Sequence, residues 1–259
     1  MHLKSRLYAG SICIALACST APAQSTSTQL PDAPSTTAAQ KTGEVTIRKL
    51  PLRFLTDEVG IITSPARIRK QDLVWLLPLA GATAASLATD SYTMRNVVTR
   101  NVSFNNAAGT ASDRLRDTTI GIPVLLFAAG QFGNNPKARE TGILAGEAVI
   151  DAVVLDEGIK YITLRERPNK NNADGKFFTG DAASDPSFTS AHSAIAWSSA
   201  AVLAGEYNKP WQQIGIYTLA SGVSLTRVLA QQHFPTDALL GSAAGWLIGR
   251  YVYRQHHRH

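Results

Sequence analysis

Runs of apolar, alanine- and glycine-rich sequence of helical length dominate this 259-residue chain and constrain its fold more than any other feature. Polar connections separate the runs, and none shows the alternation of apolar and polar residues typical of a half-buried strand. We therefore expect an all-α fold, a helical bundle with a polar separator at 91–117 and a Gly/Asp-rich loop at 168–189. The pattern predicts five or six helices, at approximately residues 71–90, 118–133, 138–164, 191–206, 211–232 and 236–254.

The N-terminal region is typical of an exported protein. A short basic stretch precedes an apolar run from Leu7 to Cys18, and a small-x-small cleavage site ends at Ala23, so residues 1–23 are interpreted as a signal peptide. The alternative is a lipoprotein anchored through Cys18. Residues 24–44, rich in Ser, Thr and Pro, predict a disordered linker. Residues 45–259 would then form a single catalytic domain.

Composition restricts the partners of the mature chain. Cys13 and Cys18 both lie in the signal, so no disulfide is expected. Removing the signal leaves 23 basic and 19 acidic residues, a net charge of +4 compared with +6 for the full chain. Such a mild excess argues against a nucleic-acid partner, and it suits a phosphorylated substrate or an anionic membrane surface. The sequence predicts no particular oligomeric state.

Membrane insertion is the main alternative for the organisation of the bundle. A span needs about 20 apolar residues, and the uncharged stretches Leu73–Thr89 and Thr118–Pro136 contain 17 and 19 residues. The helix from residue 138, however, carries Glu147 and Asp151 on one face. Inserting a carboxylate into lipid would cost on the order of several kcal/mol unless it is paired or faces a cavity. We therefore expect an exported, periplasmic globular bundle, with a bundle integral to or anchored in a bacterial membrane as the alternative.

Arg227, His233 and Asp237 form one of three segments suited to chemistry on a phosphate. If Asp237 lies in a helix, the four-residue spacing brings its carboxylate beside the ring of His233, where it accepts a ring proton and leaves the other nitrogen as a nucleophile. Pro235 is compatible with the first turn of such a helix. Taken alone, a His/Asp pair is more often a structural hydrogen bond.

Lys160 and Arg167 form the second segment. They are seven residues apart, which is two turns of helix, so both cations can point into one pocket. Two such cations repel each other unless an anion lies between them, and the planar fork of arginine suits phosphate oxygens. Pro168 then ends or bends the chain. The neighbouring Arg165 and Glu166 are interpreted as solvent-exposed.

Ser190, Ala191 and His192 form the third segment, at the start of an apolar run. Ser190 fits the N-cap position of a helix. The first turn of that helix would offer free N–H groups to an anion, and His192 would stand where it can donate a proton to a departing oxygen. An ordinary cap followed by a surface histidine is the structural alternative.

Together the three segments resemble the type 2 phosphatidic acid phosphatase (PAP2) superfamily, which also includes class A acid phosphatases and vanadium haloperoxidases. The family pattern is Lys-x6-Arg-Pro, then Pro-Ser-Gly-His, then Ser-Arg-x5-His-x3-Asp. Here the first part reads Lys160 to Pro168 without departure. Thr189 replaces proline and Ala191 replaces glycine in the second part, and Thr226 replaces serine in the third. Ala191 keeps the amide donor but restricts the backbone and adds a methyl group that could narrow the pocket.

The resemblance implies a phosphatase site at the ends of the central helices. His233 would be the nucleophile that forms a phosphohistidine, Asp237 would orient it, and His192 would protonate the leaving alcohol. No metal or other cofactor is expected, and the histidines of the C-terminal tail, His256, His257 and His259, are interpreted as solvated. The residues expected to hold the phosphoryl oxygens are Lys160, Arg167, Ser190, Ala191 and Arg227.

The expected function is therefore that of an exported, metal-independent phosphomonoesterase acting on a lipid phosphate or a small soluble phosphate, with vanadate as an inhibitor. One alternative is a vanadate-dependent haloperoxidase, in which vanadate would be a cofactor bound by His233. Another is a degenerate, non-catalytic phosphate- or lipid-binding helical protein, as Ala191 would indicate. An apolar groove for a lipid would be lined by Trp197–Leu203 or Trp246–Tyr253.

Overall fold

The computed structural model describes residues 45, 47 and 50–257. The predicted signal peptide and linker lie outside the described residues, and so does His259.

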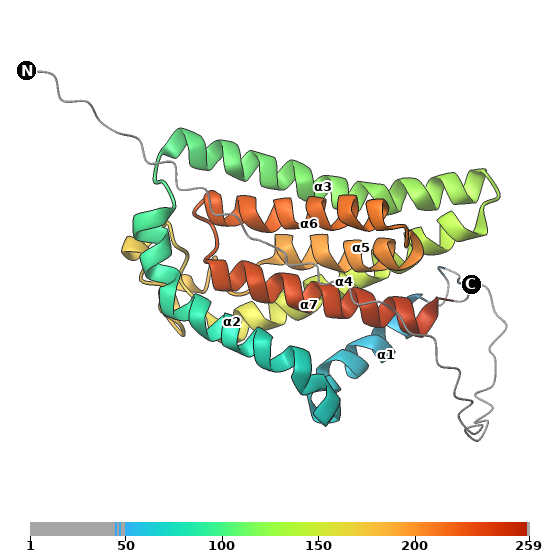
Figure 1. The fold of residues 1–259 in the computed structure, drawn as a ribbon, viewed down its shortest axis with the longest axis horizontal. Helices are drawn as coiled ribbons and strands as arrows, with labels where there is room; N and C mark the ends of the chain where they lie inside the picture. Colours follow the sequence, from blue (N-terminus) through green and yellow to red (C-terminus); the bar gives the residue numbers. More distant parts are fainter. Residues whose placement is uncertain (1–44, 46, 48–49, 258–259) are drawn as a thin grey trace, which may run out of the picture. The chain divides into compact units, whose positions relative to one another are not determined.

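Seven α-helices make up the described part of the chain, which contains no strand (Figure 1). The predicted all-α fold class is confirmed, although seven helices replace the expected five or six. They are α1 (Leu50–Ile62), α2 (Leu73–Tyr92), α3 (Val102–Phe132), α4 (Pro136–Thr163), α5 (Ala191–Glu206), α6 (Pro210–Leu229) and α7 (Pro235–His256).

The segment 91–117 is helical over most of its length, so the prediction of a polar separator there is wrong. Helix α3 begins at Val102 rather than at 118, and the side chain of Asn101 caps it by accepting a hydrogen bond from Phe104 N at 3.0 Å. The early turns of α3 are polar because several of their side chains, Asp113 and Arg116 among them, contact other polar groups instead of the apolar core.

Helix α5 is the centre of the bundle, where it contacts α3, α4, α6 and α7. Its buried positions are mostly alanine and serine, which allow neighbouring helices to approach closely. Figure 1 shows α3, α5, α6 and α7 running side by side. As a consequence, the C-terminal ends of α4 and α6 meet the N-terminal ends of α5 and α7, and Ser190 N donates to Asp237 O at 3.2 Å across this junction.

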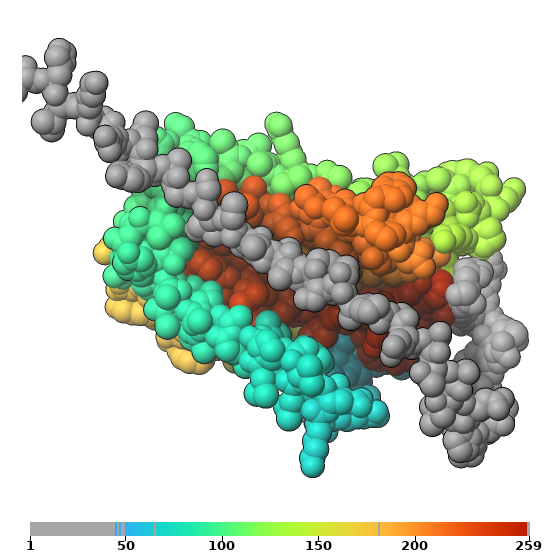
Figure 2. Space-filling view, viewed as in Figure 1, coloured from blue at the N-terminus to red at the C-terminus, as the bar shows by residue number. Residues whose placement is uncertain are grey.

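Helix α2 lies on the outside of the bundle (Figure 2). Several of its apolar side chains are exposed. The segment Lys70–Val97 is long and apolar enough to span a membrane, and none of its most apolar window is buried. Val74 and Leu77 are 80% and 65% exposed. Near its C-terminal end, in contrast, Asp90 is buried and bonded to the bundle. The helix is therefore anchored at one end and leaves an apolar face exposed along its length.

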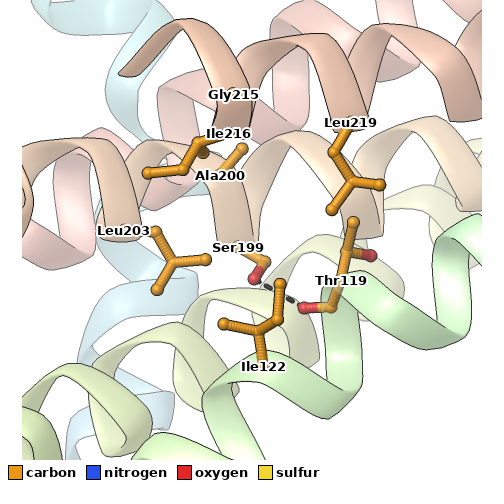
Figure 3. Close-up of a pocket in the computed structure, with 8 residues that line it drawn as sticks. All are labelled: Thr119, Ile122, Ser199, Ala200, Leu203, Gly215, Ile216 and Leu219. Atoms are coloured by element: carbon orange, nitrogen blue, oxygen red, sulfur yellow. Dashed lines mark hydrogen bonds between the residues drawn. The ribbon is translucent and has the colours of Figure 1, made fainter. Parts of the chain in front are cut away.

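A proline within α3 is accommodated by a hydroxyl from α5. Pro123 has no N–H, so the carbonyl of Thr119 loses its intrahelical partner. The hydroxyl of Ser199 donates to that carbonyl at 2.8 Å, as Figure 3 shows. Beside this bond lies a cavity of about 140 Å³ between α3, α5 and α6, lined by Thr119, Ile122, Ser199, Ala200, Leu203, Gly215, Ile216 and Leu219.

The contact between α3 and α4 generates a test of the packing. A Cβ atom added at Gly142 would lie 2.6 Å from Pro123 O and 2.6 Å from Phe127 N, whereas one added at Gly146, one turn along the same helix, would meet nothing within 4 Å. We expect Gly142→Ala to lower the free energy of unfolding by about 1–3 kcal/mol, because the helices must separate.

Gly146→Ala is the matched control, and it should leave stability unchanged or raise it by up to about 1 kcal/mol through helix propensity. Denaturant-induced unfolding followed by circular dichroism measures both values. Equal stabilities for the two variants would contradict the close helix contact.

Candidate active site

His233 lies in the short connection between α6 and α7 and is 2% exposed. Its Nδ1–H donates to Ser187 O at 2.7 Å, which fixes the tautomer and leaves the lone pair on Nε2. Arg167 Nη1 lies 3.2 Å from that Nε2. Burial, followed by the positive charges of Arg167, Arg227 and Lys160, lowers the pKa of His233 well below its ordinary value. The ring is therefore neutral at pH 7, and Nε2 faces cations.

Asp237 does not bond to the ring of His233, so the predicted direct contact is wrong. Its Oδ2 lies 3.7 Å from Nδ1, whose hydrogen-bonding position is taken by Ser187 O. The carboxylate instead caps α7 by accepting from Phe234 N at 2.8 Å, and it also accepts from the hydroxyl of Ser187. Ser187 therefore contacts both side chains and links Asp237 to His233.

Arg165 is 2% exposed and lies in a buried ion-pair network, contrary to the interpretation as a solvated residue. Its Nη1 lies 2.6 Å from Asp237 Oδ1, and its Nη2 lies 2.7 Å from Asp90 Oδ2. The guanidinium also packs against the rings of Phe177 and Phe234, at 4.7 and 4.1 Å from their centroids. The positive charge of Arg165 can be buried because two carboxylates and two aromatic faces surround the guanidinium.

Arg167 reaches the site from a loop and not from a helix. Helix α4 ends at Thr163, and Leu164 adopts a left-handed conformation with φ of 42°. The predicted two-turn helical spacing between Lys160 and Arg167 is therefore wrong. The loop returns the arginine to the bundle, where its Nη1 donates to Gln232 O at 2.8 Å.

Lys160, in the last turn of α4, is buried beside two acids. Its Nζ lies 2.8 Å from Asp156 Oδ2 and 2.8 Å from Glu157 Oε1. Thr189, which stands where the family pattern has proline, donates through Oγ1 to Asp156 Oδ1 at 2.5 Å. Glu166 is buried as well and not solvated as predicted.

His192 faces α3 from the first turn of α5. Its Nε2 lies 2.8 Å from Asp113 Oδ1 and 2.8 Å from Arg116 Nη1, and Asp113 Oδ1 lies 3.7 Å from Arg227 Nη1. Burial, followed by the charge of Arg227, lowers the pKa of His192 to about 4. Burial, followed by the charge of Arg167, lowers the pKa of Arg227 to about 10. At pH 7 the imidazole is thus neutral and the guanidinium is still charged.

Ser190 is the N-cap of α5, and this prediction is confirmed: its Oγ accepts a hydrogen bond from Ser193 N at 3.4 Å. Ala191 takes the first helical position and is not among the residues with positive φ. The backbone therefore does not require glycine there. The amides of Ala191 and His192 belong to the first turn, where N–H groups have no intrahelical acceptor and can bind an anion.

The structure brings the predicted site residues to one end of the bundle, and Pro235 begins α7 as predicted. Their catalytic roles stay predictions. Sequence reasoning missed four residues that contact them, and the N-cap signal at Asn101 would have revealed α3 and with it two of the four. Those four are Asp113, Arg116, Arg165 and Ser187. It also missed Asp90, which pairs with Arg165.

Comparison with known proteins gives three similarities. Residues 141–259 match the family described as the PAP2 superfamily. The lipid A 1-phosphatase of Porphyromonas gingivalis is 33% identical over 85 residues, which cover 30% of this chain and only 19% of that relative. A transmembrane PAP2 type phosphatidylglycerolphosphate phosphatase from Bacillus subtilis has a solved structure with a TM-score of 0.45 and 20% identity, covering 80% of this chain and 94% of that chain.

The buried network around Arg165 generates a second prediction. We expect Arg165→Met to lower the free energy of unfolding by about 3–5 kcal/mol, because Asp90 and Asp237 would become buried carboxylates without a counter-charge. Arg95→Met is the control, since Arg95 pairs with Asp174 where both side chains are partly exposed, and it should cost less than about 1 kcal/mol. Chemical denaturation gives both values, and equal losses would contradict a structural role for Arg165.

Proposed function

We propose that this protein is a phosphomonoesterase that forms a phosphohistidine on Nε2 of His233. The observation that carries the proposal is the state of this ring, which is buried and neutral, with Nδ1–H held by Ser187 O and Nε2 directed at Arg167. A nucleophile needs that free lone pair, and a phosphate needs the neighbouring cations. The match of residues 141–259 to the PAP2 superfamily and the likeness to a lipid A 1-phosphatase support the same reaction class.

The cations of the site are partnered by acids that a substrate can replace. Asp185 Oδ1 lies 2.7 Å from Arg167 Nη2, and Asp113 Oδ1 lies 3.7 Å from Arg227 Nη1, and both carboxylates are half-exposed. A phosphate offers several oxygens to both guanidinium groups at once. Substrate would therefore displace these weaker counter-ions, while the Ala191 amide supplies a neutral donor.

His192 would act as acid and then as base. A bound phosphate adds negative charge beside the ring and offsets the cations that lower its pKa, so substrate binding favours the protonated imidazole. As Nε2 of His233 bonds to phosphorus, the bond from phosphorus to the alcohol oxygen breaks, and that oxygen takes the proton of His192. The neutral ring then accepts a proton from water, which attacks the phosphohistidine and releases phosphate. Asp113, replaced by phosphate only beside Arg227, would keep its contact with His192 through both steps.

We further propose a lipid phosphate as the substrate, at a membrane surface that α2 contacts. The apolar face of α2 is exposed, and Asp90 near its end binds both Arg165 Nη2 at 2.7 Å and Thr236 N, at 3.2 Å. A lipid held against this helix would thus have its head group near the site. Export by the predicted signal peptide would place this reaction in the periplasm.

The cavity between α3, α5 and α6 supports a lipid substrate independently (Figure 3). Its lining is mainly aliphatic, and it includes Ser199, Ala200 and Leu203 from the stretch Trp197–Leu203 that the sequence suggested as a groove. Ser199 is seven residues beyond His192 on α5, about 10 Å along the helix axis. Part of an acyl chain would fit this apolar space while the phosphate occupies the cationic site.

The nucleophile is tested by phosphate release from an aryl phosphate. We expect turnover in the presence of a chelator, inhibition by vanadate, and a loss of kcat of at least about a thousandfold in His233→Ala. His257→Gln, a histidine change at the opposite end of α7, is the control and should keep full activity.

Full activity of His233→Ala would refute the assignment of the nucleophile. Phosphate binding without turnover in the unmodified protein would favour the non-catalytic alternative. Halide oxidation by vanadate-loaded protein that releases no phosphate would favour a haloperoxidase.

The lipid substrate is tested on α2. We expect the double variant Val74→Gln, Leu77→Gln to lower the rate of hydrolysis of a lipid phosphate in vesicles about tenfold or more, because less apolar surface enters the lipid. Its rate on a water-soluble aryl phosphate should not change. Phe132→Gln, which alters an exposed apolar side chain at the far end of α3, is the control. Equal losses on both substrates would contradict the role of α2.

A further inference from the structure

A second group of buried polar side chains joins α1, α4 and α7 near the other end of the bundle. Asp57, Glu147 and His256 each offer one oxygen or nitrogen atom, and these atoms all lie within 4.8 Å of one another. His256 Nε2 lies 2.8 Å from Asp57 Oδ2, so this histidine is not simply solvated as predicted. Twenty-one residues of α7 separate Pro235 from His256, about 30 Å of helix, which places the group far from the phosphate site.

Asp151 makes this group unusual. It is 0% exposed, and neither of its carboxylate oxygens has a hydrogen-bond partner among the described residues. Asp151 lies one helical turn beyond Glu147 on α4, so the two side chains share one face of the helix. Glu147 is 2% exposed, and its Oε1 also has no hydrogen-bond partner among the described residues. Two neighbouring buried acids without hydrogen-bond partners favour a positively charged ligand.

Among the described residues, the contacts of this region leave acidic oxygens without partners. Arg53 Nη2 lies 2.8 Å from Glu147 Oε2 and His256 Nε2 lies 2.8 Å from Asp57 Oδ2, whereas neither oxygen of Asp151 has a hydrogen-bond partner. One ion at 2.0–2.4 Å from its ligands holds them at most about 4.8 Å apart, which agrees with the observed spacing. A mixed set of imidazole and carboxylate ligands suits zinc and similar transition metals better than magnesium or calcium.

We propose that Asp57, Glu147 and His256 bind one divalent transition-metal ion. The ion neutralises the buried acids that Arg53 leaves uncompensated. Because its ligands come from three helices, it fastens α1 to α4 and α7. Its role is structural and separate from the phosphate chemistry at the other end of the bundle.

Zinc binding to the full chain tests this site. We expect one tightly bound Zn²⁺ per chain by elemental analysis after dialysis. We also expect a rise of about 5–10 °C in the midpoint of thermal unfolding at a zinc concentration near 100 times Kd. Phosphatase kcat on an aryl phosphate should be the same with and without zinc. A failure of zinc binding can therefore be distinguished from a failure of the proposed phosphatase function.

The variants separate this site from the histidine tail. Asp57→Asn and Glu147→Gln should each weaken zinc binding about tenfold or more. His257→Gln together with His259→Gln should bind zinc normally. Absence of stoichiometric zinc, unchanged binding by both acid variants, or loss of binding in the His257/His259 variant would each overturn the proposal.

Discussion

Arg165 connects α2, α7 and the loop after α4 through two charged hydrogen bonds, to Asp90 and to Asp237. The rest of the site depends on this buried network. Asp237 is held on one side by Arg165, and on the other it accepts from Ser187, whose carbonyl in turn holds the ring of His233. A buried guanidinium with two carboxylates is stabilising only while the set is complete. The same contacts therefore fix the end of the exposed α2 and the orientation of the histidine.

Burial decides the protonation of both histidines. Each ring lies among cations and away from water, and both effects lower its pKa. Neutral imidazole is the form that a nucleophile needs, which agrees with the role proposed for His233. For His192 the same environment means that the imidazole becomes protonated only when a substrate brings negative charge beside it. One electrostatic arrangement thus suits two different tasks.

Much of the candidate site could be predicted from the sequence, because Lys160, Arg167, His192, Arg227 and His233 occur at the spacings of a known family pattern. The reasons given for some of these residues were nevertheless wrong. Leu164 ends the helix, so Lys160 and Arg167 share a pocket through the return of a loop and not through two turns of helix. The Ser187 carbonyl takes the position expected for Asp237. Local spacing could not indicate either contact, since both depend on how the loop before α5 folds back.

The sequence by itself determined the all-α class, the chemistry-bearing side chains and the helix starts at Ser190 and Pro235, because periodicity and capping are local properties of the chain. Tertiary structure alone decided which charges are buried. A charged residue just beyond a helix end is ordinarily exposed, and Arg165 is buried only because Asp90, 75 residues earlier, lies against it. In the same way α3 brings Asp113 to His192 across 79 residues. Charges far apart in sequence stabilise one another only after the helices have packed, and no local pattern reports that contact.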